Sequence, residues 1–190
     1  AKLIAGGTDL SLEFTQQLKE YRTLISLNSI AELQQLDENT NGLTIGAAVP
    51  YSEFINAFTK QYPEAKEMFH RLGSEQIRNV GTLGGSLVNA SPIGDPAPLL
   101  IALNASLIIS RPSNERQVLV SEFFTAYRQT VLEANEVVVA ILIPPRPENL
   151  KLACYKISKR MEDDISAVLF AIAYENIGDK LQNVRTGFGG

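Results

Sequence analysis

Two glycine-rich stretches hold the residue types and spacing most suited to binding chemistry. The first, Ile4-Ala5-Gly6-Gly7-Thr8-Asp9-Leu10, lies at the start of the chain, and the second runs from Ile77 to Pro96 with glycines at 81, 84 and 85. Glycine has no Cβ, so the backbone can turn sharply and bring its amides close to a ligand. Several amides that converge on one point favour an anion. Two such loops in one domain predict a diphosphate held from two sides.

Polar side chains beside the second loop can support the same ligand. Thr82 and Ser86 carry hydroxyls that either bond phosphate oxygens or cap the turn. Asp95, between Gly94 and Pro96, either accepts hydrogen bonds from sugar hydroxyls or caps the helix that follows. For either glycine loop alone, an ordinary turn remains the alternative.

Two common nucleotide-binding motifs are excluded by spacing. Gly81-x-x-Gly84-Gly85 does not fit the Rossmann fingerprint, and Ser86-Leu87-Val88 after it predicts a strand where that fold needs a helix. No Gly-Lys-Ser/Thr occurs, which excludes a P-loop nucleotide triphosphatase. The residues therefore indicate a phosphate-bearing cofactor bound outside these two folds.

The elements around the loops mix strands and helices without a regular strand–helix–strand repeat, which predicts an α+β fold. A polar turn is expected at 37–42, and the helix after the first loop is expected to extend from Thr8 or Asp9 to about Glu20. The expected strands span residues 2–5, 23–27, 43–46, 106–110, 117–120, 137–143, 151–159, 168–174 and 183–188. The expected helices are capped or started near residues 29, 50, 63, 97 and 121.

Composition narrows the function classes. The chain has 190 residues, 45% of them hydrophobic and 20% charged, as in ordinary globular proteins. A net charge of −4 without a basic stripe argues against nucleic acid, and no apolar run is long enough for a membrane span. The single cysteine, Cys154, indicates a reducing compartment, the cytoplasm, and cannot by itself ligate an iron–sulfur cluster. The chain starts without methionine and ends on Gly190, so we expect a piece of a longer polypeptide.

Five motifs in order carry a family resemblance. Arg78-Asn79-Val80-Gly81-Thr82-Leu83-Gly84-Gly85-Ser86, with Ser91-Pro92-Ile93-Gly94-Asp95-Pro96 after it, resembles the FAD-binding domain of the molybdenum hydroxylases. That family includes xanthine dehydrogenase, carbon monoxide dehydrogenase and hydroxybenzoyl-CoA reductase. The first glycine loop resembles the family's first pyrophosphate loop, and residues 74–78, 122–128 and 154–168 look most like the small subunit of bacterial-type xanthine dehydrogenase. The resemblance covers essentially the whole chain.

The resemblance implies a fold and a division of the chain. The fold is the FAD-binding type of the PCMH and vanillyl-alcohol-oxidase flavoproteins, with two α/β subdomains. Residues 1–144 would be the FAD-binding domain, trimmed at its N-terminus, and 145–150, with three prolines nearby, would be a stiff linker. Residues 151–190 would be the incomplete start of a C-terminal domain like that of the carbon monoxide dehydrogenase flavoprotein.

The resemblance also implies roles for single residues. Asp95 would anchor the sugar or adenine end of FAD, and Leu72 and Val138 would lie on the two apolar sides of the flavin ring. Lys156 matches a basic residue near the flavin, where a cation would stabilise a reduced, anionic ring; without the resemblance it is a solvated lysine on a strand. The pyrophosphate would be held, mainly by backbone amides, by Leu3, Ile4, Ala5, Gly6, Gly7, Thr8, Asp9, Leu10, Thr82, Leu83, Gly84, Gly85 and Ser86.

Some positions leave alternatives open. Ser86 stands where the family usually has asparagine, so the contact with phosphate would be weaker or bridged by water. Asp163, in the acidic run 162–164, would tune access of an electron acceptor by resemblance, and otherwise belongs to a solvated turn. Arg78 would pair with phosphate or with Asp95, or form a structural salt bridge. Cys154 is interpreted as a packed strand residue.

These roles lead to a functional hypothesis. Electrons would pass from a molybdenum site through two 2Fe–2S clusters to FAD on this chain, and then to NAD⁺ or another acceptor. The molybdopterin-binding subunit and the 2Fe–2S domain would be its partners. Two alternatives stay open: the flavoprotein of a carbon monoxide dehydrogenase or hydroxybenzoyl-CoA reductase, and a non-catalytic module that has lost FAD, which Ser86 alone favours.

Overall fold

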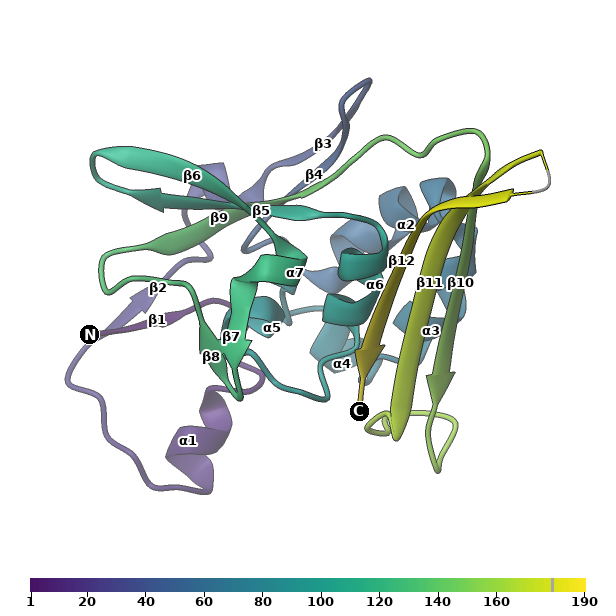
Figure 1. The fold of residues 1–190 in the computed structure, drawn as a ribbon. Helices are drawn as coiled ribbons and strands as arrows, with labels where there is room; N and C mark the ends of the chain where they lie inside the picture. The colour runs from purple at the N-terminus through teal and green to yellow at the C-terminus, as the bar shows by residue number, and fades with distance from the viewer. Residues whose placement is uncertain (179) are drawn as a thin grey trace.

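The computed structural model describes residues 1–178 and 180–190 and confirms the mixed α+β fold (Figure 1). Its centre is a five-stranded antiparallel sheet of order β3-β4-β9-β5-β6. The strands of this sheet are β3 (Leu36–Asn39), β4 (Gly42–Gly46), β5 (Ser106–Arg111), β6 (Asn114–Leu119) and β9 (Val137–Ile143). All residues of β9 are apolar, as expected for a strand in the middle of a sheet that is covered on both faces.

A small N-terminal lobe carries the first glycine loop. β1 (Lys2–Ile4) and β2 (Leu24–Ser26) pair in parallel, and α1 (Ser11–Thr15) lies between them in the chain. The turn η1 (Ala31–Gln34) leads from this lobe into the central sheet. The first glycine loop therefore begins at the carboxyl end of β1.

Short helices separate the strands and cover the central sheet. After β4 come α2 (Tyr51–Gln61), η2 (Pro63–Ala65), α3 (Lys66–His70), α4 (Glu75–Arg78), α5 (Leu83–Asn89) and α6 (Pro96–Ala102). α7 (Val120–Phe123) and the small hairpin of β7 (Phe124–Ala126) and β8 (Gln129–Thr130) follow β6. No helix in residues 1–178 and 180–190 is both long and apolar enough to cross a bilayer.

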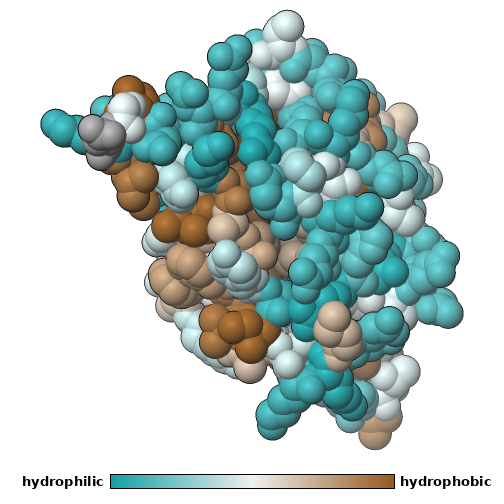
Figure 2. Space-filling model, turned by 90° about the vertical axis from the view of Figure 1, so that its right-hand side faces the viewer, coloured by the Kyte–Doolittle hydropathy of each residue, from teal (hydrophilic) through white to brown (hydrophobic). Residues whose placement is uncertain are grey.

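The C-terminal region forms a second antiparallel sheet, of order β10-β11-β12. Its strands are β10 (Leu150–Ile157), β11 (Val168–Ile177) and β12 (Lys180–Gly189). The inner face, which includes Leu152 and Leu169, joins one hydrophobic core with the central domain. The outer face is also largely apolar. The rings of Phe170 and Phe188 pack there with their centres 4.8 Å apart, and Figure 2 shows hydrophobic residues gathered on this side.

Three local predictions were wrong. The strand expected at Ser86-Leu87-Val88 is part of helix α5, because the Thr82 hydroxyl caps this helix by accepting from the Gly85 amide. A local cap outweighs the weak strand preference of three residues. The helix after the first loop ends at Thr15 and not near Glu20, and Leu18 takes a positive φ of 51°. Within the turn expected at 37–42, residues 37–39 belong to strand β3.

The predicted linker is held by a cluster of polar contacts. Arg146 donates to both carboxylate oxygens of Glu64 at 2.7 and 2.9 Å, and to the Gln61 carbonyl. Its guanidinium also lies 5.3 Å from the Tyr62 ring centre, and the Tyr62 hydroxyl donates to the Pro144 carbonyl. The pKa of Tyr62 is raised to about 12 by burial, so this hydroxyl stays a donor at neutral pH. The segment that leads to the C-terminal sheet is therefore fixed to the end of α2.

We expect Glu64→Gln to weaken this attachment. The hydrogen bonds from Arg146 lower the pKa of Glu64 from its ordinary value of 4.5, so the ion pair stabilises the folded state above that pH and is lost as pH falls. Because both side chains are about 30% exposed or less, the loss is about 1 kcal/mol after discounting for solvent screening. Denaturant unfolding at neutral and acid pH measures it.

Glu38→Gln is the matched control, since Glu38 makes a single exposed contact of 3.5 Å with Lys60. It should leave the free energy of unfolding almost unchanged. The difference in the free energy of unfolding between Glu64→Gln and the parent chain should disappear as the pH falls below 4.5. Equal effects of the two substitutions at neutral pH would contradict a stabilising role for the Arg146 contacts.

Candidate cofactor site

The two glycine loops touch each other. A Cβ added to Gly6 would lie 1.9 Å from the Val80 carbonyl oxygen and 2.9 Å from the Gly81 Cα, so only glycine permits this approach. The Thr8 hydroxyl also lies beside Gly81, 3.6 Å from where a Cβ would be. The structure thus brings together two stretches about 75 residues apart in the sequence.

The first loop presents a row of free amides. In the described part of the chain, the backbone N–H groups of residues 5–10 have no hydrogen-bond acceptor. The next amide along the chain, that of Ser11, donates to the Gly7 carbonyl. Gly7 has a φ of +69°, a left-handed conformation that redirects the neighbouring amides. Consecutive free amides in such a turn form an anion-binding nest.

The second loop is the start of helix α5. The Thr82 hydroxyl is engaged as the helix cap, which settles one of the two roles expected for it. Gly84 is needed for packing, because a Cβ there would lie 2.5 Å from the Ala47 carbonyl oxygen. Within residues 1–178 and 180–190, the amides of Leu83 and Gly84 at the start of α5 have no hydrogen-bond acceptor, as expected for the first turn of a helix.

Asp95, Lys156 and Ser166 form a buried polar triad. The Lys156 ammonium donates to Asp95 Oδ2 at 2.6 Å and to Ser166 Oγ at 2.9 Å, and the Ser166 hydroxyl donates to Asp95 Oδ1 at 2.5 Å. The side chains of Lys156 and Asp95 are 2% and 8% exposed. The interpretation of Lys156 as a solvated strand lysine is therefore wrong. Asp95 stands at the start of α6 but its side chain does not cap that helix.

Tyr51 connects the triad with the second glycine loop. Its ring lies 3.4 Å from the position of a Cβ on Gly81, and its amide donates to the Gly81 carbonyl. Burial raises the pKa of Tyr51 well above its usual range. A hydrogen bond with the Ser86 hydroxyl opposes this shift, and the Asp95 carboxylate adds to it. Asp95 thus lies close to both Tyr51 and Lys156.

Burial also raises the pKa of the Cys154 thiol, to about 12, with smaller contributions from Asp95 and Glu67. The thiol is therefore protonated at neutral pH and is a poor nucleophile. Cys154 packs against the hydrophobic core, as its interpretation as a strand residue requires.

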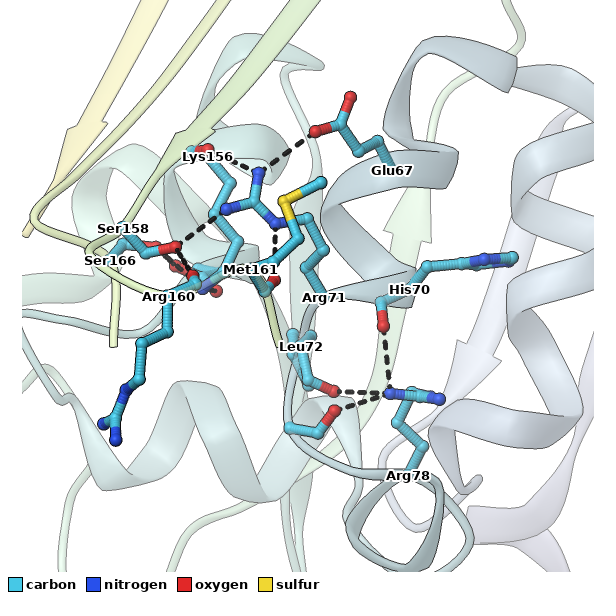
Figure 3. Close-up of polar contacts among 12 residues, drawn as sticks. Glu67, His70, Arg71, Leu72, Arg78, Lys156, Ser158, Arg160, Met161 and Ser166 are labelled. Atoms are coloured by element: carbon cyan, nitrogen blue, oxygen red, sulfur yellow. Dashed lines mark hydrogen bonds and ion pairs between the residues drawn. The ribbon is translucent and has the colours of Figure 1, made fainter. Parts of the chain in front are cut away.

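Arg78, the last residue of α4, is hydrogen-bonded to the turn that carries Leu72 (Figure 3). Arg78 donates to the carbonyls of His70, Leu72 and Gly73 at 3.2, 3.2 and 2.6 Å. Its proposed pairing with Asp95 is wrong, and its role is to hold the turn that carries Leu72. Leu72 is half-buried beside the core. Val138 is only 2% exposed within β9 and belongs to the hydrophobic core.

Arg71 was missed by the sequence predictions. Its guanidinium donates to the Lys156 and Met161 carbonyls, to Ser158 Oγ and to Glu67, and thereby joins α3 to the turn after β10 (Figure 3). No sequence signal marks it, because three of its four partners lie more than 80 residues away, and two of those are backbone carbonyls. Ser166 was also missed as a site residue, although it lies within a motif that carries the resemblance.

The segment with Glu162 and Asp163 borders an open depression of about 960 Å³. Its lining includes His70, Arg71, Gly73, Arg78, Met161, Glu162 and Asp163. The structure therefore places Asp163 on the same side as the turn that carries Leu72. Asp163 has a positive φ of 51°, a conformation that aspartate tolerates better than most residues.

Sequence comparison identifies the family. The profile of the family described as "FAD binding domain in molybdopterin dehydrogenase" matches residues 1–146. The chain is 30% identical to xanthine dehydrogenase/oxidase of Gallus gallus and 32% identical to xanthine dehydrogenase of Drosophila subobscura, over all of its own length in both cases. It spans only 15% and 16% of those two proteins.

Solved structures agree with the sequence match. The fold superposes on a chain of carbon monoxide dehydrogenase from Hydrogenophaga pseudoflava with a TM-score of 0.91 and 27% identity, and covers 99% of this chain and 66% of that one. Quinoline 2-oxidoreductase from Pseudomonas putida 86 gives a TM-score of 0.86 at 26% identity. The predicted family, fold type and FAD cofactor are confirmed at the level of the family. With its two glycine loops in contact and their amides free, this chain belongs to the family of FAD-binding domains of molybdopterin dehydrogenases.

Proposed function

We propose that this chain is the FAD-binding, electron-transferring part of a xanthine-dehydrogenase-like molybdenum hydroxylase. The observation that carries the proposal is the contact between the two glycine loops, with free amides at residues 5–10 and at the start of α5. Two nests side by side suit a diphosphate, whose two charged groups need donors from two directions. This ligand therefore fits the residues present.

In this proposal the chain's own residues bind and orient the cofactor. Amides of residues 3–10 and 82–86 hold the pyrophosphate, and Ser86 contributes a hydroxyl in place of the longer asparagine. Leu72 and Val138 provide apolar contacts to the ring, and Lys156 provides the buried cation. When bound, FAD supplies exchange of electrons between one-electron and two-electron carriers, and the protein supplies position and electrostatics.

The partners belong to the same proposal. Relatives named xanthine dehydrogenase are about six times longer than the part matched here, so the molybdopterin site and the 2Fe–2S clusters would lie on other domains or subunits. The single Cys154 supports this division for the clusters. NAD⁺ would be the acceptor, approaching past Asp163, and the cytoplasm would be the location.

We also propose that residues 151–190 begin a second domain, joined to the first by residues 145–150. The family profile ends at residue 146, inside the proposed linker. The shared core and the contacts of Arg146 show that this region is nevertheless packed firmly on residues 1–144.

We expect the purified chain to bind FAD saturably, and Thr8→Glu to weaken binding by at least about tenfold, or about 1.4 kcal/mol. Glutamate at position 8 places a carboxylate between the loops, where it repels the pyrophosphate. Titration followed by flavin fluorescence measures the dissociation constant. A substitution at Gly84 would not separate binding from folding, because any side chain there would collide with Ala47.

Ser113→Glu is the matched control, since it adds the same charge in the exposed turn between β5 and β6. It should bind FAD as the parent chain does. If the two variants bind equally well, the diphosphate does not lie between the glycine loops. If the parent chain binds no FAD, the alternative of a module that has lost its cofactor replaces the proposal.

A carbon monoxide dehydrogenase type of flavoprotein is the second candidate, favoured by the TM-score of 0.91. The identity of 30–32% to xanthine dehydrogenases, against 27% to that structure, favours the first candidate. In this proposal NAD⁺ is the acceptor of the first candidate.

We expect NADH to reduce the FAD-loaded chain, seen as loss of the visible absorbance of oxidised flavin under anaerobic conditions. The depression beside Asp163 offers space for a dinucleotide next to the turn of Leu72. A reduced one-electron dye serves as a control that the bound flavin is competent. Reduction by the dye with none by NADH would contradict NAD⁺ as the acceptor of this chain.

A further inference from the structure

The segment at the start of α2 is joined to the second glycine loop through the backbone. A β-bridge pairs Pro50 with Thr82. The amide of Tyr51 donates to the Gly81 carbonyl at 2.9 Å. Two neighbouring residues of one segment are thus paired with two neighbouring residues of the other, which fixes their register.

Gly81 is the residue at which Tyr51 and the two glycine loops meet. A Cβ on Gly81 would lie 3.4 Å from the Tyr51 ring and 3.6 Å from the Thr8 hydroxyl of the first loop. The Gly81 Cα in turn lies 2.9 Å from the position of a Cβ on Gly6. A residue that holds Gly81 in place therefore also supports the contact between the loops.

The hydrophobic core holds the Tyr51 ring in place. The residue is 4% exposed, and the ring centres of Phe54 and Phe69 lie 5.4 and 6.4 Å from its own. Side chains in a close-packed core sit in one rotamer, because the space for others is filled. The phenol oxygen is therefore presented from a fixed position.

The phenol of Tyr51 reaches the other end of the loop, where it is hydrogen-bonded to the Ser86 hydroxyl. Burial raises the pKa of this phenol, so it keeps its proton at neutral pH and has that proton to donate. A serine hydroxyl that accepts from a phenol retains its own proton for another acceptor, such as a phosphate oxygen. Tyr51 thus contacts Gly81 and Ser86, the two residues that flank 82–85.

We propose that Tyr51 is a positioning residue for the second glycine loop. Its backbone and ring hold Gly81, and its phenol orients the Ser86 hydroxyl towards the diphosphate, so that residues 82–85 keep one conformation between two fixed ends. The proposal rests on the proposed FAD-binding function and deepens it. Ser86 is shorter than the asparagine usual in the family, and orientation by Tyr51 compensates for the shorter side chain.

The test is a double-mutant cycle with Tyr51→Phe, Ser86→Ala and the combination of both. The FAD dissociation constant is measured by flavin fluorescence, and the thermal midpoint is measured on the FAD-free chain. Tyr51→Phe keeps the ring and removes only the hydroxyl, so it should weaken FAD binding about fivefold, the loss of one hydrogen bond. Ser86→Ala should weaken binding at least as much, and the combined variant should bind FAD as Ser86→Ala alone does.

Ser86→Asn provides a rescue experiment. The longer amide reaches the phosphate without orientation by the phenol, so adding Tyr51→Phe to Ser86→Asn should leave FAD affinity unchanged. If Tyr51→Phe weakens FAD binding about fivefold whether residue 86 is serine, alanine or asparagine, then Tyr51 acts independently of Ser86 and the proposal is overturned.

Tyr62→Phe is the matched control, because Tyr62 is also buried, at 1% exposed, but its hydroxyl donates to the Pro144 carbonyl beside the linker. It should lower the thermal midpoint and leave FAD affinity unchanged. If Tyr51→Phe behaves in the same way, its role is purely structural and the proposal is overturned.

The FAD-free thermal midpoints separate this proposal from the proposed function. Absence of FAD binding by the parent chain would refute the proposed function. The thermal cycle would still show whether Tyr51 and Ser86 are coupled. Coupled shifts would support the bond between phenol and hydroxyl, and additive shifts would overturn it together with the positioning role.

Discussion

The contact of backbone against backbone at Gly6 is the constraint on which the site depends. The Val80 carbonyl occupies the space that any side chain at position 6 would need. This contact fixes the N-terminal lobe against the turn between α4 and α5, and it sets the free amides of the first loop beside the start of α5. Without it the two loops would remain separate turns, neither of which is a specific site for a diphosphate.

The glycines of the site serve different physical purposes. Gly6 and Gly84 permit close packing, against Val80 and Ala47, whereas Gly7 supplies a left-handed turn. Of these glycines, only Gly7, with its left-handed conformation, redirects the neighbouring amides. A glycine-rich motif therefore combines residues that build the fold with residues that shape the ligand site, and substitutions in the two classes have different meanings.

Cationic side chains connect the C-terminal sheet to the rest of the molecule. Arg146 bonds to Glu64 at the linker, Arg71 bonds to carbonyls of the turn after β10, and Lys156 bonds to Asp95 before α6. Each contact joins residues at least 61 positions apart. Together with the shared core, they pack residues 151–190 against the domain that the family profile matches, although that profile stops at residue 146.

The sequence by itself determined the α+β class, the two glycine loops, the central strand at 137–143 and the family, because these depend on local patterns and ordered motifs. Only the tertiary structure decided that the loops touch, that Lys156 is buried against Asp95, and that Arg71 and Ser166 are hydrogen-bonded to Lys156. The short run at 86–88 shows the same limit at small scale, since a cap from Thr82 converted an apparent strand into helix α5. Contacts between residues 60 to 90 positions apart leave no periodicity in the sequence, and three-dimensional packing alone selects them.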